Sequence, residues 1–142
     1  MADAALFGAG GTGPLPAGVE RPVSVSDLTR KRWELLALTT EGCRRLARTP
    51  QAVCACGTAL LPSGWSGLAV RQIRAERVVS CGLSPRDSLT FSSLDGGRTV
   101  VCVQRALSRP DGGTVEPQEL SAGRADGPPE DLLAAVGLGL LL

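Results

Sequence analysis

The stretch from Ser88 to Val115, SLTFSSLDGGRTVVCVQRALSRPDGGTV, decides the fold that the sequence predicts. Its first part, Ser88–Leu94, alternates apolar and polar residues, which is typical of a half-buried strand. Asp95–Gly97 indicates a hairpin turn, because glycine accepts a positive φ. Arg98–Leu107 is rich in β-branched residues and predicts a central strand. Together these segments predict an antiparallel strand pair.

The same stretch predicts a third strand. Pro110–Gly113 has the residues of a second turn, and Thr114–Glu116 follows it as a short β segment. Pro117 cannot donate a backbone hydrogen bond, so it marks this strand as an edge. The sequence therefore predicts a three-stranded antiparallel β-meander.

Upstream of the meander the sequence indicates helices. Asp27–Leu38 and Cys43–Ala47 predict two helices, Gln51–Leu61 predicts a buried strand, and Leu68–Val79 predicts a further helix. In that last helix Arg71, Arg74 and Arg77 recur at intervals of three residues. Helices followed by a meander indicate the α+β class: a small single domain with N-terminal helices, a C-terminal antiparallel β-meander and flexible termini.

Composition divides the chain into three parts. Residues 1–22 form a flexible head rich in glycine and proline, residues 23–120 form the α+β domain, and residues 121–142 form an acidic and apolar tail. The apolar run Leu132–Leu142 is shorter than the roughly 20 residues that a membrane span needs. We expect it to be a short helix that docks on the domain or on a partner.

Charge is distributed unevenly along the chain. Residues 21–110 carry fourteen Lys and Arg against six Asp and Glu, whereas residues 111–142 carry six acids against Arg124. Clustered arginine attracts anions, so we expect an RNA or acidic partner to face Arg30, Lys31, Arg32, Arg44, Arg45, Arg71, Arg74 and Arg77. Two simpler interpretations stay open: a solvated basic surface, and the arginine-rich usage that GC-rich coding produces.

The composition excludes most catalytic chemistry. The chain has no His and no Tyr, so a His-activated nucleophile cannot form within it. We expect no catalytic, cofactor-binding or metal-binding residues and no enzymatic activity. Cys54-x-Cys56 could supply half of a thiolate metal site, but core packing explains the pair as well. The segment Gly8–Gly13 lacks the Lys-Ser/Thr of a phosphate loop and follows no predicted strand.

Three segments carry a resemblance to a known family. Val53-Cys54-Ala55-Cys56-Gly57-Thr58-Ala59-Leu60, Val70-Arg71-Gln72-Ile73-Arg74 and Ser88–Leu107 with Pro110-Asp111-Gly112 resemble the small accessory subunit of the eukaryotic tRNA-splicing endonuclease. The resemblance implies an α+β fold and a non-catalytic role. The chain departs from the family where Val101-Cys102-Val103 replaces the tyrosines of the penultimate strand.

These observations predict a non-catalytic structural subunit of an intracellular RNA-processing complex. The missing secretory signal favours a reducing, intracellular location in which the cysteines are free thiols. We expect the nucleus rather than the cytoplasm, as the resemblance implies. Few aromatic residues favour contact with the RNA backbone over base reading. We expect a hetero- or homodimer with partner contacts at Trp65, Val101, Val103 and Val115.

Two alternatives remain open. The first is a protein-interaction adaptor without nucleic acid, anchored by Trp65 and Leu132–Leu142. The second is a small-molecule-binding regulatory domain, since the meander is also similar to effector domains related to chorismate lyase. An apolar pocket between sheet and helices, with an arginine at its mouth, would favour that second alternative.

Overall fold

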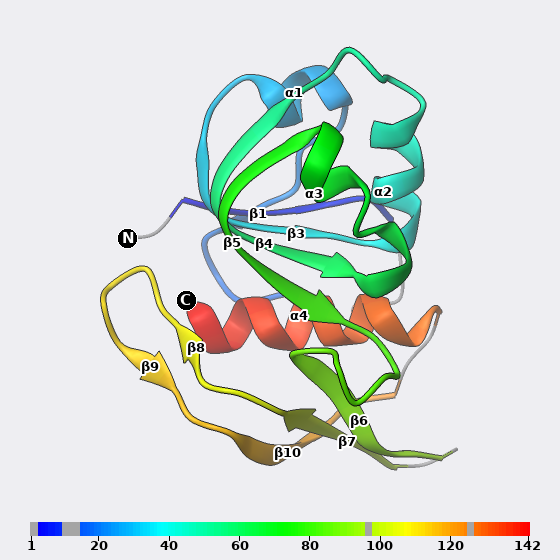
Figure 1. Ribbon diagram of the computed structural model, residues 1–142, viewed down its shortest axis with the longest axis vertical. Coiled ribbons are helices and arrows are strands. Elements are labelled where there is room, and N and C mark those ends of the chain that lie inside the picture. Colours follow the sequence, from blue (N-terminus) through cyan, green and yellow to red (C-terminus); the bar gives the residue numbers. More distant parts are fainter. Residues whose placement is uncertain (1–2, 10–14, 96–97, 125–126) are drawn as a thin grey trace.

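The computed structural model describes residues 3–9, 15–95, 98–124 and 127–142. Its strands are β1 (Ala4–Phe7), β2 (Val19–Glu20), β3 (Trp33–Leu38), β4 (Cys54–Pro62), β5 (Ile73–Cys81), β6 (Leu89–Asp95), β7 (Arg98–Val103), β8 (Leu107–Ser108), β9 (Thr114–Val115) and β10 (Gln118–Ala122). Eight of them form a mixed sheet with the order β10-β7-β6-β5-β4-β3-β1-β2 (Figure 1). Along this order, neighbouring strands from β2 to β6 are parallel. β7 is antiparallel to β6, and β10 is antiparallel to β7.

Helices cover both faces of this sheet. The helices are α1 (Val25–Thr29), α2 (Thr40–Ala47), α3 (Leu68–Arg71), α4 (Pro129–Leu141) and the 3₁₀ turn η1 (Ser63–Trp65). The core on one face, which we call the α2-side core, packs Leu28 of α1, Leu46 of α2 and Leu68 of α3 against the strands. The α4-side core packs Leu133 and Leu138 against the opposite face. The molecule is therefore a mixed eight-stranded sheet with the connecting helices α1, α2 and α3 on one face and the C-terminal helix α4 on the other; its strands β1 to β5 have the order 2-1-3-4-5.

This architecture shows that the expected arrangement, with N-terminal helices followed by a C-terminal antiparallel meander, is wrong. Helices lie between the strands only from β2 to β5, the strands β5 to β10 follow one another without a helix, and most strand pairs of the sheet are parallel. The expectation of flexible termini is also wrong: β1 is fully buried inside the sheet, and α4 crosses one face of it in Figure 1. Both ends of the chain supply apolar surface that a core of this size needs.

Two predicted helices, Asp27–Leu38 and Leu68–Val79, begin as the short helices α1 and α3 but continue as strands, for identifiable reasons. Trp33–Leu38 forms β3, which is buried on both faces because α2 and α4 cover it from opposite sides. Such a strand is apolar throughout and lacks the two-residue period of a half-buried strand. Within Leu68–Val79, only Leu68–Arg71 is helical, and the β-branched residues from Ile73 onward belong to β5.

The meander is confirmed only in its first two strands. β6 and β7 pair as an antiparallel hairpin as predicted, although its turn residues Gly96 and Gly97 lie outside the described residues. The predicted third strand pairs elsewhere, because β9 joins β8 across the turn Arg109–Gly113 in a separate two-stranded sheet. After Pro117 the chain enters β10, which takes the edge position beside β7.

Strands β3, β4 and β5 bend together near their amino ends. The pairing skips Glu34, Gly57 and Glu76 but resumes in the same register. Trp33 before the bend enters the α2-side core, whereas Leu35 after it enters the α4-side core. A Cβ on Gly57 would lie 2.8 Å from the Glu34 carbonyl oxygen, so glycine permits this close approach.

Candidate anion-binding rim

The carboxyl ends of the parallel strands are the first place to look for a ligand site. In open sheets of parallel strands, ligands often bind there at the point where the strand order reverses, here between β1 and β3. The segment Gly8–Gly13 begins at this point, directly after β1. A strand therefore does precede it, contrary to the sequence analysis, while Gly10 to Gly13 lie outside the described residues.

Two glycines close the crevice between β1 and α2. Gly8 has a φ of +107°, and a Cβ there would collide with the Thr39 hydroxyl and with the backbone of Gly42. A Cβ on Gly42 would collide with the carbonyl oxygen of Phe7. The end of β1 thus packs directly on the first turn of α2, which leaves no room between them for a phosphate group.

The polar groups at this edge are occupied by the chain itself. Thr39 caps α2 by accepting a hydrogen bond from Gly42 N at 3.1 Å, and its hydroxyl lies 3.1 Å from the Ala9 carbonyl oxygen. Glu41 accepts a hydrogen bond from the backbone N–H of Ala9 at 2.9 Å. Asp131, on the first turn of α4, accepts hydrogen bonds from Thr40 N at 2.8 Å and from the Thr40 hydroxyl at 3.2 Å.

Asp131 thus occupies the N-terminus of α2, where an external anion would otherwise bind. Its side chain is almost completely buried, and this burial raises the pKa of the carboxyl group, while the two hydrogen bonds from Thr40 oppose the increase. Glu130 and Glu41 nearby raise the pKa further by repulsion. The carboxyl edge is therefore closed and acidic, and it does not favour a phosphate ligand.

The opposite edge of the parallel strands carries basic side chains. We define the basic rim as Arg30 and Arg32 before β3, Arg48 after α2, and Arg71 and Arg74 around the start of β5. All five residues are exposed to solvent. Three segments far apart in the sequence therefore present arginine at the amino ends of neighbouring strands.

Gln72 holds two of these segments together. Its side chain is 5% exposed, and its Nε2 donates to the carbonyl oxygens of Leu46 at 2.9 Å, Thr49 at 2.9 Å and Ala52 at 3.2 Å. These carbonyls belong to the end of α2 and the loop that follows it, where Arg48 lies. Gln72 itself stands between Arg71 and Arg74, so its hydrogen bonds fix the separation of the two basic segments.

Half of the eight basic residues selected from the sequence have a carboxylate partner. Arg30 lies 3.9 Å from Asp27, Arg32 lies 3.7 Å from Glu76, and Arg45 lies 3.8 Å from Glu41. Lys31 contacts Glu20 at 3.1 Å and Asp3 at 3.5 Å, and its hydrogen bond to Glu20 raises its pKa. Within the described residues, no carboxylate stands at ion-pair distance from Arg44, Arg71, Arg74 or Arg77.

The structure also separates these residues in space. Arg45 turns toward β1, where its guanidinium donates to the Val23 carbonyl and lies 4.7 Å from the centre of the Phe7 ring. Arg44 lies on the exposed side of α2, and Arg77 lies within β5 beyond the bend. The rim therefore gathers Arg30, Arg32, Arg71 and Arg74 of the sequence-selected residues, together with Arg48.

The residues selected as partner contacts are mostly internal. Val101 and Val103 are at most 1% exposed in the α4-side core, and Val115 packs there with 6% exposure. Trp65 is half-buried, and its side chain packs on the α2-side core and covers part of it. None of the three valines presents its side chain to a partner in this structure.

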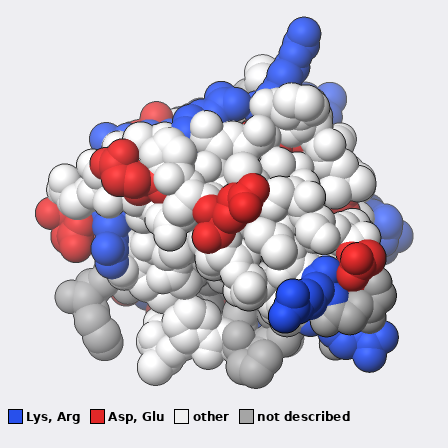
Figure 2. All heavy atoms as spheres, turned by 90° about the horizontal axis from the view of Figure 1, so that it is seen from below, with Lys and Arg blue, Asp and Glu red and all other residues white. Residues whose placement is uncertain are grey.

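The outward face of β6, β7 and β10 offers a neutral surface instead. The residues whose side chains alternate away from the α4-side core are Thr90, Ser93, Val100, Cys102, Glu119 and Ser121. Figure 2 shows this underside of the molecule, which is largely uncharged with one acidic group near its middle. We call it the neutral face.

The cysteines belong to the packing of the molecule. Cys43, Cys54, Cys56 and Cys81 are buried, and Cys102 is half-buried. Burial raises the pKa of Cys43 and Cys54 to about 12 and that of Cys56 to about 11, so these thiols stay protonated at neutral pH. Among the described residues no group of His, Cys, Asp and Glu is arranged to hold a metal ion.

Sequence reasoning missed Gln72, because a single glutamine gives no signal of the three carbonyl oxygens that surround it. Arg48 carries a signal as the last arginine of the cluster that begins at Arg44.

No described helix has the length and apolar character needed to cross a membrane. No family model matches the chain, and no curated protein or solved structure matches it.

Proposed function

We propose that this protein is a non-catalytic subunit that binds RNA through phosphate contacts at the basic rim. The observation that carries the proposal is the convergence of Arg48, Arg71 and Arg74 at one edge of the sheet, with no carboxylate partner among the described residues. Guanidinium groups bind phosphate with bidentate hydrogen bonds and stay charged at every physiological pH.

The rim supports contact with the RNA backbone more than reading of bases. Trp33 is 1% exposed, its Nε1 donates to the Leu28 carbonyl, and Lys31 covers its ring at 4.4 Å. Sequence-specific readers of single strands stack bases on exposed aromatic side chains. The proposed role is therefore that of a structural subunit in an RNA-processing complex, with the neutral face available to pair with another subunit.

Salt dependence of RNA affinity tests this proposal. We would measure the binding of a labelled single-stranded RNA by fluorescence anisotropy over a series of salt concentrations. The triple variant Arg48→Gln, Arg71→Gln, Arg74→Gln should bind at least about tenfold more weakly at low salt. Its salt slope should also be smaller by about 2, because each lost phosphate contact removes about 0.7 from the slope for a single strand.

The matched control replaces three exposed arginines of the antiparallel part, Arg86, Arg98 and Arg105, by glutamine. It changes the net charge by the same amount and should leave most of the affinity in place. RNA affinity that does not weaken with salt, or an equal loss in both triple variants, would contradict the proposal.

A specific observation keeps the adaptor alternative as a second candidate. Val53 is 42% exposed and Val70 is 87% exposed, and both lie in the segments that carry the rim arginines. Apolar groups beside unpaired arginines also suit an acidic peptide. A defined protein partner that remains bound after nuclease treatment, with no retention on immobilised RNA, would favour this candidate.

A further inference from the structure

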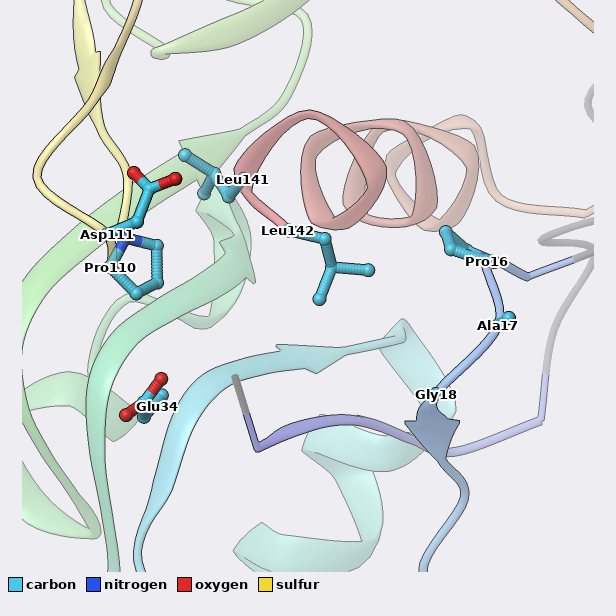
Figure 3. A pocket seen from close by; sticks show the side chains of 8 residues that line it. All are labelled: Pro16, Ala17, Gly18, Glu34, Pro110, Asp111, Leu141 and Leu142. Carbon is cyan, nitrogen blue, oxygen red and sulfur yellow. The ribbon is translucent and has the colours of Figure 1, made fainter. Parts of the chain in front are cut away.

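A cavity of about 540 Å³ opens at the C-terminal end of α4. Its walls are Leu141 and Leu142, the segment Pro16–Gly18, and Pro110 with Asp111 at the tip of the β8–β9 hairpin. Figure 3 shows the Leu142 side chain reaching into the space between Pro16 and this hairpin, with Glu34 below it. The volume lies within the range of small-molecule sites, whose walls are mostly apolar with a few polar groups.

A second, smaller cavity of about 250 Å³ adjoins the first. Glu34 and Pro110 line both spaces, so they form the boundary between them. The smaller cavity has a different character, because Arg32, Glu76, Arg77 and Arg109 contribute to its wall. The pair therefore consists of a mainly apolar chamber, whose wall also holds the carboxylate of Asp111, and a charged chamber, with Glu34 at the junction.

The β8–β9 hairpin holds Arg109 in the wall of the charged chamber, next to Pro110 at the boundary. Leu107 and Val115 anchor the hairpin in the α4-side core. Its turn is held by hydrogen bonds between the backbones of Arg109 and Gly113 at 2.8 Å and of Gly112 and Arg109 at 3.0 Å. Arg109 donates from Nη2 to the Leu142 carbonyl, while its Nε is buried without an acceptor among the described residues and is closed to a ligand. Nη1 is therefore the part of the guanidinium left to bind a ligand.

The charges of the two chambers are only partly balanced internally. Arg32 lies 3.7 Å from Glu76. In the described part of the chain, neither Arg77 nor Glu34 has a partner of opposite charge at ion-pair distance. A ligand that suits this arrangement carries an anionic group for Arg77 and Arg109, a cationic group for Glu34 and an apolar part for the larger chamber.

We infer that the two cavities form one binding site for an α-amino acid with a large apolar side chain. The α-carboxylate lies in the charged chamber and accepts hydrogen bonds from Arg77 and Arg109. The α-ammonium group donates to Glu34 at the junction. The side chain enters the apolar chamber against Leu141 and Leu142, where its burial contributes hydrophobic free energy. This inference does not depend on RNA binding.

A matched ligand series tests each part of the inference. We would titrate the full chain calorimetrically with L-leucine, L-phenylalanine and three analogues of leucine that each lack one group. Glycine lacks the apolar side chain, 4-methylpentanoate lacks the ammonium group, and 3-methylbutylamine lacks the carboxylate. L-leucine or L-phenylalanine should bind, and each analogue should bind at least about tenfold more weakly. Glycine loses the hydrophobic burial of the side chain, and each of the other two leaves a charged group of the site unpaired.

Two substitutions at exposed residues assign the polar contacts. Arg77→Gln should weaken leucine binding several-fold and leave the affinity of 3-methylbutylamine unchanged. Glu34→Gln should weaken leucine binding but leave that of 4-methylpentanoate unchanged. Arg98→Gln, at the start of β7, is the matched control.

The inference is overturned if neither L-leucine nor L-phenylalanine binds up to its solubility limit. It is also overturned if leucine and its analogues bind equally, or if Arg77→Gln and Arg98→Gln have the same effect. A protein that binds RNA but no amino acid refutes this inference alone. A protein that binds leucine but no RNA refutes only the proposed function.

Discussion

The two ends of the parallel strands use their polar side chains in different ways. At the carboxyl ends, Thr39, Glu41 and Asp131 all hydrogen-bond to groups of the same chain. At the amino ends, Arg48, Arg71 and Arg74 stay exposed without a carboxylate partner among the described residues. The edge at which this fold usually binds ligands is thus closed by internal contacts, whereas the opposite edge is open.

The reason lies in the packing of α2 and α4 around the end of β1. Gly8 and Gly42 let β1 and α2 touch, and Asp131 brings the start of α4 to the start of α2. A carboxylate supplied by the chain replaces the phosphate that a helix N-terminus of this fold often holds. The comparison teaches that strand order alone does not locate the binding edge, since side chains decide which edge stays accessible.

The largest expected effect concerns the closed edge. Gly42→Ala would place a Cβ against the Phe7 carbonyl oxygen, which is backbone and cannot rotate away. The first turn of α2 would have to move off β1, and we expect a loss of about 3 kcal/mol in the free energy of unfolding. Urea denaturation followed by circular dichroism measures it.

Gly64→Ala is the matched control for this substitution. A Cβ on Gly64 meets no atom within 4 Å, so a change below about 0.5 kcal/mol is expected. If Gly42→Ala were as mild as Gly64→Ala, β1 and α2 would not be in direct contact, and the carboxyl edge would have to be regarded as open.

The second-largest expected effect is a loss of stability when Gln72, which supports the open edge, is replaced. Gln72→Met keeps the length of the side chain but removes the donor shared by three carbonyl oxygens. We expect a loss of about 2 kcal/mol in the free energy of unfolding, because buried acceptors lose their partner. Thermal or urea denaturation checks the loss, with Gln51→Met at an exposed position as the control.

RNA affinity gives a second measurement for the same variant. If Gln72 positions Arg48 relative to Arg71, Gln72→Met should weaken RNA binding although no charge is changed. Unaltered affinity in a destabilised but folded variant would show that the rim arginines act without a fixed separation.

The parts of the fold that could be predicted from sequence depend on local interactions. The β6–β7 hairpin has alternating side chains, and the sequence between its strands contains two glycines, so both signals can be read within ten residues of one another. β3 could not be assigned, because WELLAL suits a buried strand and an amphipathic helix alike. Only the layers that α2 and α4 add on its two faces decide between them, and these come from distant parts of the chain.

The same limit applies to the candidate site. The charges at Arg30–Arg32 and Arg71–Arg74 are visible in the sequence, but their partners are not. Arg32 pairs with Glu76 and Lys31 with Asp3 and Glu20, all remote in the chain. Which arginines remain unpaired is therefore a property of the tertiary structure, as is the gathering of Arg48 and Arg71 around Gln72.

The smallest expected effect is a change in how the free energy of unfolding depends on pH, through Asp131 at the closed edge. Burial raises the pKa of Asp131 above its ordinary value of 3.8. The folded state then keeps the proton over a pH range in which the unfolded chain has lost it, so stability falls as the pH rises through that range. Asp131→Asn keeps an acceptor for Thr40 and removes this titration.

We therefore expect the unfolding free energies of wild type and Asp131→Asn to diverge as the pH rises above about 4, with the variant losing less stability. The divergence stops once the folded carboxyl group is ionised. Denaturant titrations between acidic and neutral pH measure it, with Asp95→Asn at an exposed position as the control. Parallel curves would mean that water reaches Asp131, and that the start of α2 is accessible to an external anion after all.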